Sequence, residues 1–121
     1  MDQTQTVLGF IAAWNARDLD RIAAGLAEDV VYHNIPVQPL RGREAVRAAV
    51  GPLLESCSAI DWEVHHIAAT ADGLVLTERT DRFVRDGQES SIRVMGTFEV
   101  KDGLIVAWRD YFDMAQWRRQ A

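Results

Sequence analysis

The chain has 121 residues, a length that suits one domain, and 48% of them are apolar, enough for a core without disulfides or metal ions. Thirteen basic residues stand against 18 acidic ones, which gives a net charge of −5. The basic residues are scattered along the chain, so the sequence argues against a nucleic-acid-binding surface and against a polybasic membrane patch. The only cysteine, Cys57, cannot form an intrachain disulfide.

The beginning of the chain lacks the basic and apolar segments of a signal peptide. No apolar run approaches the roughly 18 residues that a membrane span requires. We therefore expect a cytoplasmic protein without membrane or nucleic-acid partners.

The first half of the sequence is typical of helices. Apolar residues recur at helical spacing near the start: Val7, Phe10, Ile11 and Trp14. Thr4 or Thr6 is the expected cap of this helix, and Asp18 or Asp20 the expected cap of a short second helix that carries Leu26.

A strand is predicted over residues 30–35, followed by an extended loop that Pro36 and Pro39 impose. A third helix is predicted from Arg43 to Ser56, with a kink or interruption at Pro52.

The second half predicts four consecutive antiparallel strands. Three Asp-Gly pairs, a strong hairpin signal, separate its apolar segments: Asp72-Gly73, Asp86-Gly87 and Asp102-Gly103. The expected strands are residues 62–70, 74–85, 90–100 and 104–113. Helices followed by strands predict an α+β fold, in which a bent meander covered by helices on one face forms a cone with one apolar pocket.

Side chains on one face of a strand recur at every second residue, which predicts where the polar groups point. In the last strand the even positions are the more apolar: Leu104, Val106, Trp108, Asp110 and Phe112. In strand 74–85 the odd positions carry charges between apolar ends: Val75, Thr77, Arg79, Asp81 and Phe83. In strand 30–35, Tyr32 and Asn34 share a face with Val30.

If these faces line one cone, the pocket holds two carboxylates, one guanidinium, a phenol and an amide. An Arg two residues before an Asp is often only a surface ion pair, but three strands agree in phase here. One Arg79 between Asp81 and Asp110 leaves a charge of −1 when both acids ionise, so one carboxyl is expected to hold a proton while the other stays ionised. Such a pair can supply one acid and one base at neutral pH.

The same residues resemble the motifs of the limonene epoxide hydrolase family, which belongs to the nuclear-transport-factor-2-like superfamily. The matching segments, in the same order and at similar spacing, are Tyr32–Pro36 with Arg41–Arg43, Thr77–Phe83, Val94–Val100 and Trp108–Asp113. The resemblance implies one domain over residues 1–121 with the cone-shaped α+β fold of that superfamily, a strongly curved mixed sheet with N-terminal helices over it.

The resemblance also implies roles. Asp81 is expected to protonate the epoxide oxygen, and Asp110 to take a proton from the attacking water. Arg79 is expected to orient both carboxylates, and Tyr32 and Asn34 to hold the water. No covalent intermediate, cofactor or metal is expected.

A pocket for a small lipophilic epoxide is expected from strand phase and the resemblance together. Its expected substrate-binding residues are Phe83, Ile92, Val94, Trp108, Phe112 and Trp117. Trp14 and Trp62 are expected in the core, and Gly96 at a close backbone approach or a bulge. A homodimer is expected, because the family commonly forms dimers and the open sheet face leaves apolar surface to cover.

Two other functions remain open at this point. A ketosteroid-isomerase-like or polyketide-cyclase-like enzyme also places an acid in such a cone, but an isomerase pairs a base with oxyanion donors and needs no second acid bridged by Arg79. A non-catalytic binding module predicts a broken polar set, whereas all five polar positions are present.

Overall fold

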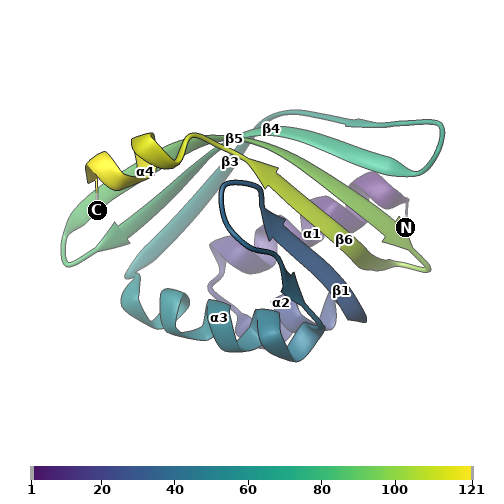
Figure 1. Cartoon of the computed structure of the whole chain (residues 1–121), viewed down its shortest axis with the longest axis horizontal. Helices are drawn as coiled ribbons and strands as arrows, with labels where there is room; N and C mark the ends of the chain where they lie inside the picture. Colours follow the sequence, from purple (N-terminus) through teal and green to yellow (C-terminus); the bar gives the residue numbers. More distant parts are fainter. Residues whose placement is uncertain (1, 121) are drawn as a thin grey trace.

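A curved six-stranded sheet arches over three N-terminal helices in the computed structural model, which describes residues 2–120 (Figure 1). The elements in chain order are α1 (Gln3–Asn15), α2 (Leu19–Ala24), β1 (Leu26–Asn34), β2 (Leu40–Arg41), α3 (Arg43–Ser56), β3 (Ala59–Ala69), β4 (Leu74–Arg85), β5 (Gln88–Lys101), β6 (Leu104–Tyr111) and α4 (Met114–Gln120).

The sheet is mixed, with strand order β2-β1-β6-β5-β4-β3. β3 to β6 form the predicted antiparallel meander, and β1 runs parallel to β6. The last two Asp-Gly pairs occupy the tight turns, and Asp86 and Asp102 both take positive φ, at 51° and 53°. These turns confirm the hairpin prediction because Asp-Gly tolerates that conformation at low cost.

Helix starts and strand limits differ in part from the expectations. Asp2, rather than Thr4 or Thr6, caps α1 in a reciprocal pair of hydrogen bonds with Gln5, while Asp18 caps α2 as one of the two expected residues. Leu26 lies in β1 rather than in the second helix.

The third helix has the predicted bounds, and it continues through Pro52 without interruption. Pro52 is exposed and lies near the end of this helix. The predicted interruption at Pro52 was therefore wrong.

The expected alternation along the last strand changes phase at a β-bulge. Val100 pairs with Ile105 and Glu99 with Ala107, so Val106 is an extra residue on β6. The buried residue near the start of β6 is therefore Ile105, and the expectation for Leu104 and Val106 was wrong. Beyond the bulge the even positions face inward as predicted.

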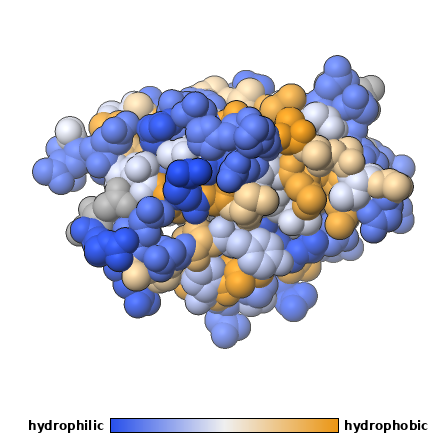
Figure 2. Space-filling view, turned by 90° about the horizontal axis from the view of Figure 1, so that it is seen from above, coloured by the Kyte–Doolittle hydropathy of each residue, from blue (hydrophilic) through white to orange (hydrophobic). Residues whose placement is uncertain are grey.

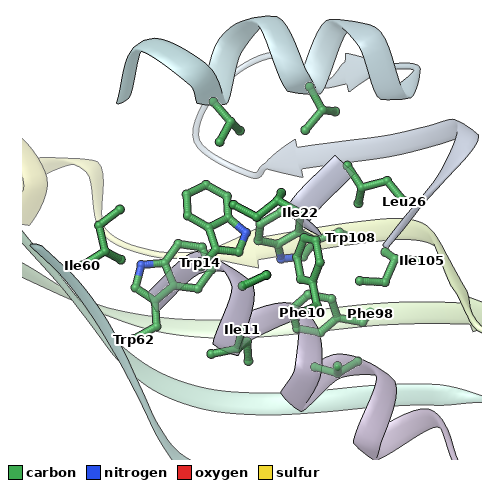
Figure 3. Close-up of a cluster of buried hydrophobic side chains, with 14 of the residues drawn as sticks. Phe10, Ile11, Trp14, Ile22, Leu26, Ile60, Trp62, Phe98, Ile105 and Trp108 are labelled. Atoms are coloured by element: carbon green, nitrogen blue, oxygen red, sulfur yellow. The ribbon is translucent and has the colours of Figure 1, made fainter. Parts of the chain in front are cut away.

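The main core lies between the arch and the helices, where aromatic rings meet (Figure 3). Trp14 of α1 stacks on Trp62 of β3, with ring centroids 4.3 Å apart. Phe10 meets the ring of Trp108 edge to face at 5.1 Å, and Phe98 stacks on that ring at 5.4 Å. These contacts attach α1 to the middle of the sheet.

A short C-terminal helix, α4, follows β6 where the sequence pattern predicted none. The last strand was expected to run to Asp113 but ends at Tyr111, and the Asp113 carboxylate accepts a hydrogen bond from the backbone N–H of Ala115 at the start of α4. Trp117 of this helix packs edge to face on Phe83, at 5.6 Å between centroids. Among the described residues, no helix is long and apolar enough to cross a membrane.

Candidate active site

The register of the sheet brings polar residues from three strands together. Asp110 of β6 pairs with Asn34 of β1 on one side and with Gly96 of β5 on the other. Gly96 in turn pairs with Thr77 of β4. Paired residues share a face of the sheet, so these positions form one row across it. Arg79 lies two residues further along β4, on the same face.

The guanidinium of Arg79 lies between the two carboxylates and is fully buried, at 0% exposure. Its Nε and Nη2 donate to the two oxygens of Asp81, at 3.0 and 2.9 Å. Nη1 and Nη2 donate to the two oxygens of Asp110, at 3.3 and 3.0 Å. Nη1 also donates to Oγ1 of Thr77, at 3.0 Å. An arginine has five N–H donors, so every one has a partner here.

The two carboxylates differ in how many donors they receive. Asp81 is 2% exposed and accepts the two hydrogen bonds from Arg79. Asp110 is 3% exposed and accepts a third hydrogen bond, from the indole N–H of Trp108 at 2.9 Å. Donors to a carboxylate stabilise its ionised form, so the ionised form of Asp110 has one donor more than that of Asp81.

Burial raises the pKa of Asp81 to about 6, because a charged carboxylate loses its hydration in this environment. The hydrogen bonds and positive charge of Arg79 lower the pKa of Asp81 and offset part of this effect, while the negative charge of Asp110 adds to the rise. With the proton on Asp81, the set of two carboxyls and one guanidinium is neutral.

Tyr32 and Asn34 stand beside Asp110. The hydroxyl of Tyr32 donates to Oδ1 of Asn34 at 3.0 Å, and the Tyr32 ring stacks on Trp108 at 4.0 Å. Burial and the charge of Asp110 raise the pKa of Tyr32, so its hydroxyl stays neutral and remains a donor. Trp108, at 0% exposure, thus contacts both the Tyr32 ring and the Asp110 carboxylate.

A cavity of about 200 Å³ opens over these groups. Its polar lining comes from Tyr32, Asn34, Asp81 and Asp110. The remaining lining residues are apolar: Trp14, Val37, Leu53, Trp62, Phe83, Ile92, Val94, Phe112, Met114 and Trp117. The arrangement therefore offers a proton donor and a proton acceptor on the wall of an apolar chamber.

All five polar residues that the sequence analysis selected lie together. Of the expected substrate-binding residues, five line the cavity, whereas Trp108 lies beneath Tyr32 and Asp110 and contacts those two. Trp14 and Trp62 are buried as expected and also line the cavity.

Three further residues line the cavity that were not predicted from the sequence: Val37, Leu53 and Met114. The apolar residue after Pro36 and the apolar face of the third helix were available signals for the first two. Met114 lies on the unexpected helix α4 and had no such signal.

Comparison with known proteins identifies the family of the chain. The sequence model of the limonene-1,2-epoxide hydrolase catalytic domain matches residues 1–120. The chain is 37% identical to epoxide hydrolase EphG of Mycobacterium tuberculosis over 109 residues, which cover 89% of this chain and 71% of that protein.

Solved structures agree in fold. A limonene-epoxide-hydrolase-like epoxide hydrolase of M. tuberculosis superposes with a TM-score of 0.87 and 32% identity, over 97% of this chain and 86% of that one. A SnoaL-like polyketide cyclase from Shewanella denitrificans superposes with a TM-score of 0.86 and 17% identity, over 96% of this chain and 93% of that one. A nuclear-transport-factor-2-like protein from Burkholderia pseudomallei superposes with a TM-score of 0.83 and 21% identity, over 96% of this chain and 94% of that one. The cone-shaped fold expected from the sequence is confirmed.

The raised pKa of Asp81 predicts how stability depends on pH. The folded-state pKa of about 6 lies above the ordinary value of 3.8, so the contribution of Asp81 to stability is present below about pH 4 and is lost as pH rises through 6. Asp81→Asn keeps a neutral side chain at every pH. Its stability relative to the unchanged protein should therefore rise by about 2–3 kcal/mol between pH 4 and pH 7, at about 1.4 kcal/mol per pKa unit.

Urea unfolding of both proteins at each pH measures this difference. Asp61→Asn is the matched control, because the Asp61 side chain is 68% exposed on the same sheet. A difference for Asp81→Asn that stays constant with pH, or falls as pH rises, contradicts the raised pKa.

Proposed function

Because the chain belongs to the limonene-1,2-epoxide hydrolase family, we propose that it adds water to a small lipophilic epoxide and releases a vicinal diol. The observation that carries the proposal is Arg79, which joins two buried carboxylates on the wall of an apolar cavity. Opening an epoxide requires a proton for the leaving oxygen and a base for the attacking water, and positioned acid and base groups each accelerate such steps about 10²- to 10⁴-fold.

Asp81 is the proposed general acid. Its raised pKa keeps a proton on the carboxyl in mildly acidic solution and leaves a usable fraction at neutral pH. It lines the cavity, so its proton can pass to the epoxide oxygen as the C–O bond breaks. Arg79 stabilises the carboxylate that remains.

Asp110 is the proposed general base, and Tyr32 and Asn34 are the proposed holders of the water. Since Tyr32 donates to Oδ1 of Asn34, the amide NH₂ of Asn34 is oriented away from that hydroxyl and can donate to a water oxygen in the cavity. Such a water presents its hydrogens to Asp110 and its remaining lone pair to the epoxide carbon. Fixing the nucleophile in this way supplies an orientation gain.

A single displacement by water accounts for the reaction without an enzyme ester. Three N–H donors from Arg79 and Trp108 occupy three of the roughly four lone-pair sites of the Asp110 carboxylate, so one site on Oδ2 is left to accept a hydrogen from the water. An isomerase of the same fold would need oxyanion donors facing a base, whereas here the guanidinium is engaged with two carboxylates.

The proposed substrate is a compact epoxide with an apolar body. The cavity of about 200 Å³ has aromatic and aliphatic walls and only four polar lining residues, all at the reacting end. Terpene, styrene-type and cycloalkene epoxides have this character, and a screen of these classes with lipid epoxides identifies the preferred body.

We further infer a homodimer, in the cytoplasm, that buries the outer face of the sheet. Met95 and Tyr111 are paired neighbours in β5 and β6 and are 50% and 46% exposed. Apolar side chains gather on this side of the molecule among hydrophilic ones (Figure 2).

Sedimentation tests the homodimer. The unchanged protein should sediment with twice the monomer mass, and Met95→Glu with the monomer mass. An unchanged protein that sediments as a monomer contradicts the inference.

Removal of either carboxyl tests the acid and base roles. Asp81→Asn and Asp110→Asn should each reduce diol formation more than about a hundredfold, since each removes one proton transfer while preserving shape. Diol is measured by chromatography on the best epoxide of the screen, with circular dichroism as the check on folding. Asp61→Asn, on the outer face, should retain full activity. More than about a tenth of the activity in either folded cavity variant is incompatible with these roles.

A single turnover in ¹⁸O-labelled water tests the direct attack. With enzyme in excess over epoxide, the first diol should carry the label, because its new oxygen comes from bulk water. Unlabelled diol in that turnover, with label appearing in an enzyme carboxyl, would show a covalent path.

A further inference from the structure

The ion pair between Arg79 of β4 and Asp110 of β6 spans the intervening strand β5 at Gly96. Gly96 is the residue between Thr77 and Asp110 in the row that runs across β4, β5 and β6. A Cβ placed on Gly96 would lie 2.6 Å from Oδ1 of Asp110, still closer to Nη1 of Arg79, and 3.0 Å from Oγ1 of Thr77. The space that a side chain would fill is therefore the space in which the guanidinium meets Asp110.

Thr77 completes the partners of that guanidinium. Its Oγ1 accepts from Nη1 of Arg79 at 3.0 Å and donates to the backbone carbonyl of Gly96 at 3.3 Å. Thr77 is 1% exposed. Without this hydroxyl, one N–H of a cation with 0% exposure would lose its acceptor, which is costly.

The two residues act on the position of Arg79 rather than on a substrate. Nη1 has two hydrogens, of which one reaches Asp110 at 3.3 Å and the other reaches Thr77 at 3.0 Å. If the hydroxyl is removed, Asp110 is the acceptor that remains for Nη1. We expect the guanidinium then to move toward Asp110 and away from Asp81.

We propose that Thr77 and Gly96 are positioning residues that hold the guanidinium of Arg79 between the two carboxylates, and so fix the geometry of the acid and of the base. This inference rests on the proposed function for its catalytic meaning, but its structural part does not depend on activity. The cavity lining contains neither residue, so neither contacts the substrate.

Thr77→Val tests the hydroxyl, because valine has nearly the same shape and cannot accept a hydrogen bond. Arg79 lowers the pKa of Asp81 in the unchanged protein. Moving the Arg79 guanidinium away from Asp81 should raise the titration midpoint of the Asp81 carboxyl by about half a pH unit or more, as measured by carboxyl ¹³C NMR. Thr77→Ser keeps the hydroxyl and should restore the original midpoint.

The same variants give a kinetic readout. Thr77→Val should lower kcat about tenfold or more while KM changes less than about threefold, because the apolar walls are untouched. The alkaline limb of the kcat/KM profile, which follows loss of the Asp81 proton, should move to higher pH. Thr97→Val, on the opposite face of β5, is the matched control and should change neither quantity.

Gly96→Ala tests the space. The added methyl must displace Nη1 of Arg79 or the Asp110 carboxylate, so kcat should fall at least as far as in Thr77→Val. Gly9→Ala is its control, since nothing lies within 4 Å of a Cβ on Gly9. If Gly96→Ala fails to fold, the Thr77 series still decides the inference.

The outcomes separate the two proposals. A normal Asp81 midpoint and a normal kcat in Thr77→Val, or a loss that Thr77→Ser does not restore, overturns the positioning role. A protein that hydrolyses none of the epoxides but shows the shifted Asp81 midpoint in Thr77→Val leaves the positioning of Arg79 supported and the proposed function refuted.

Discussion

The fully buried guanidinium of Arg79, shared between Asp81 and Asp110, is the interaction on which the site depends. A buried ion costs several kcal/mol unless it is paired and all its hydrogen bonds are made. Two carboxylates around one cation leave a surplus negative charge, which a proton on one of them removes. The proton is therefore part of the ground-state structure as well as the proposed reactant. The row across the sheet, with no side chain at Gly96, provides the room for this arrangement.

Strand phase made much of the site predictable. Asp-Gly turns with known geometry and a period of two placed Arg79, Asp81 and Asp110 on one inner face, and the structure has them there. The Trp108 indole contact with Asp110 was outside the reach of that reasoning, because alternation gives a face and not a hydrogen bond. The role of Gly96 depends on which residues pair across three strands, and register is not readable from one strand at a time.

Other failures have tertiary causes. Helix α4 has seven residues, too short to form from its own propensity, and it is stabilised by the contact of Trp117 with Phe83. Pro52 was expected to break a helix that in fact continues to Ser56. The bulge at Val106 inserts one residue without any glycine or proline to mark it. For α4 the deciding contact joins segments far apart in the sequence, and the bulge is defined by pairing with the neighbouring strand β5.

The bulge in β6 also divides that strand into two independently patterned halves. Before it, the inward-facing residue is Ile105, at an odd position; after it, the inward-facing residues are Trp108 and Asp110, at even positions. In a regular strand, residues an odd number of positions apart point to opposite faces, so Ile105 and Asp110 could not both point inward. The extra residue uncouples them. Ile105 can therefore pack in the core while the Asp110 carboxylate meets Arg79 from the same side of the sheet.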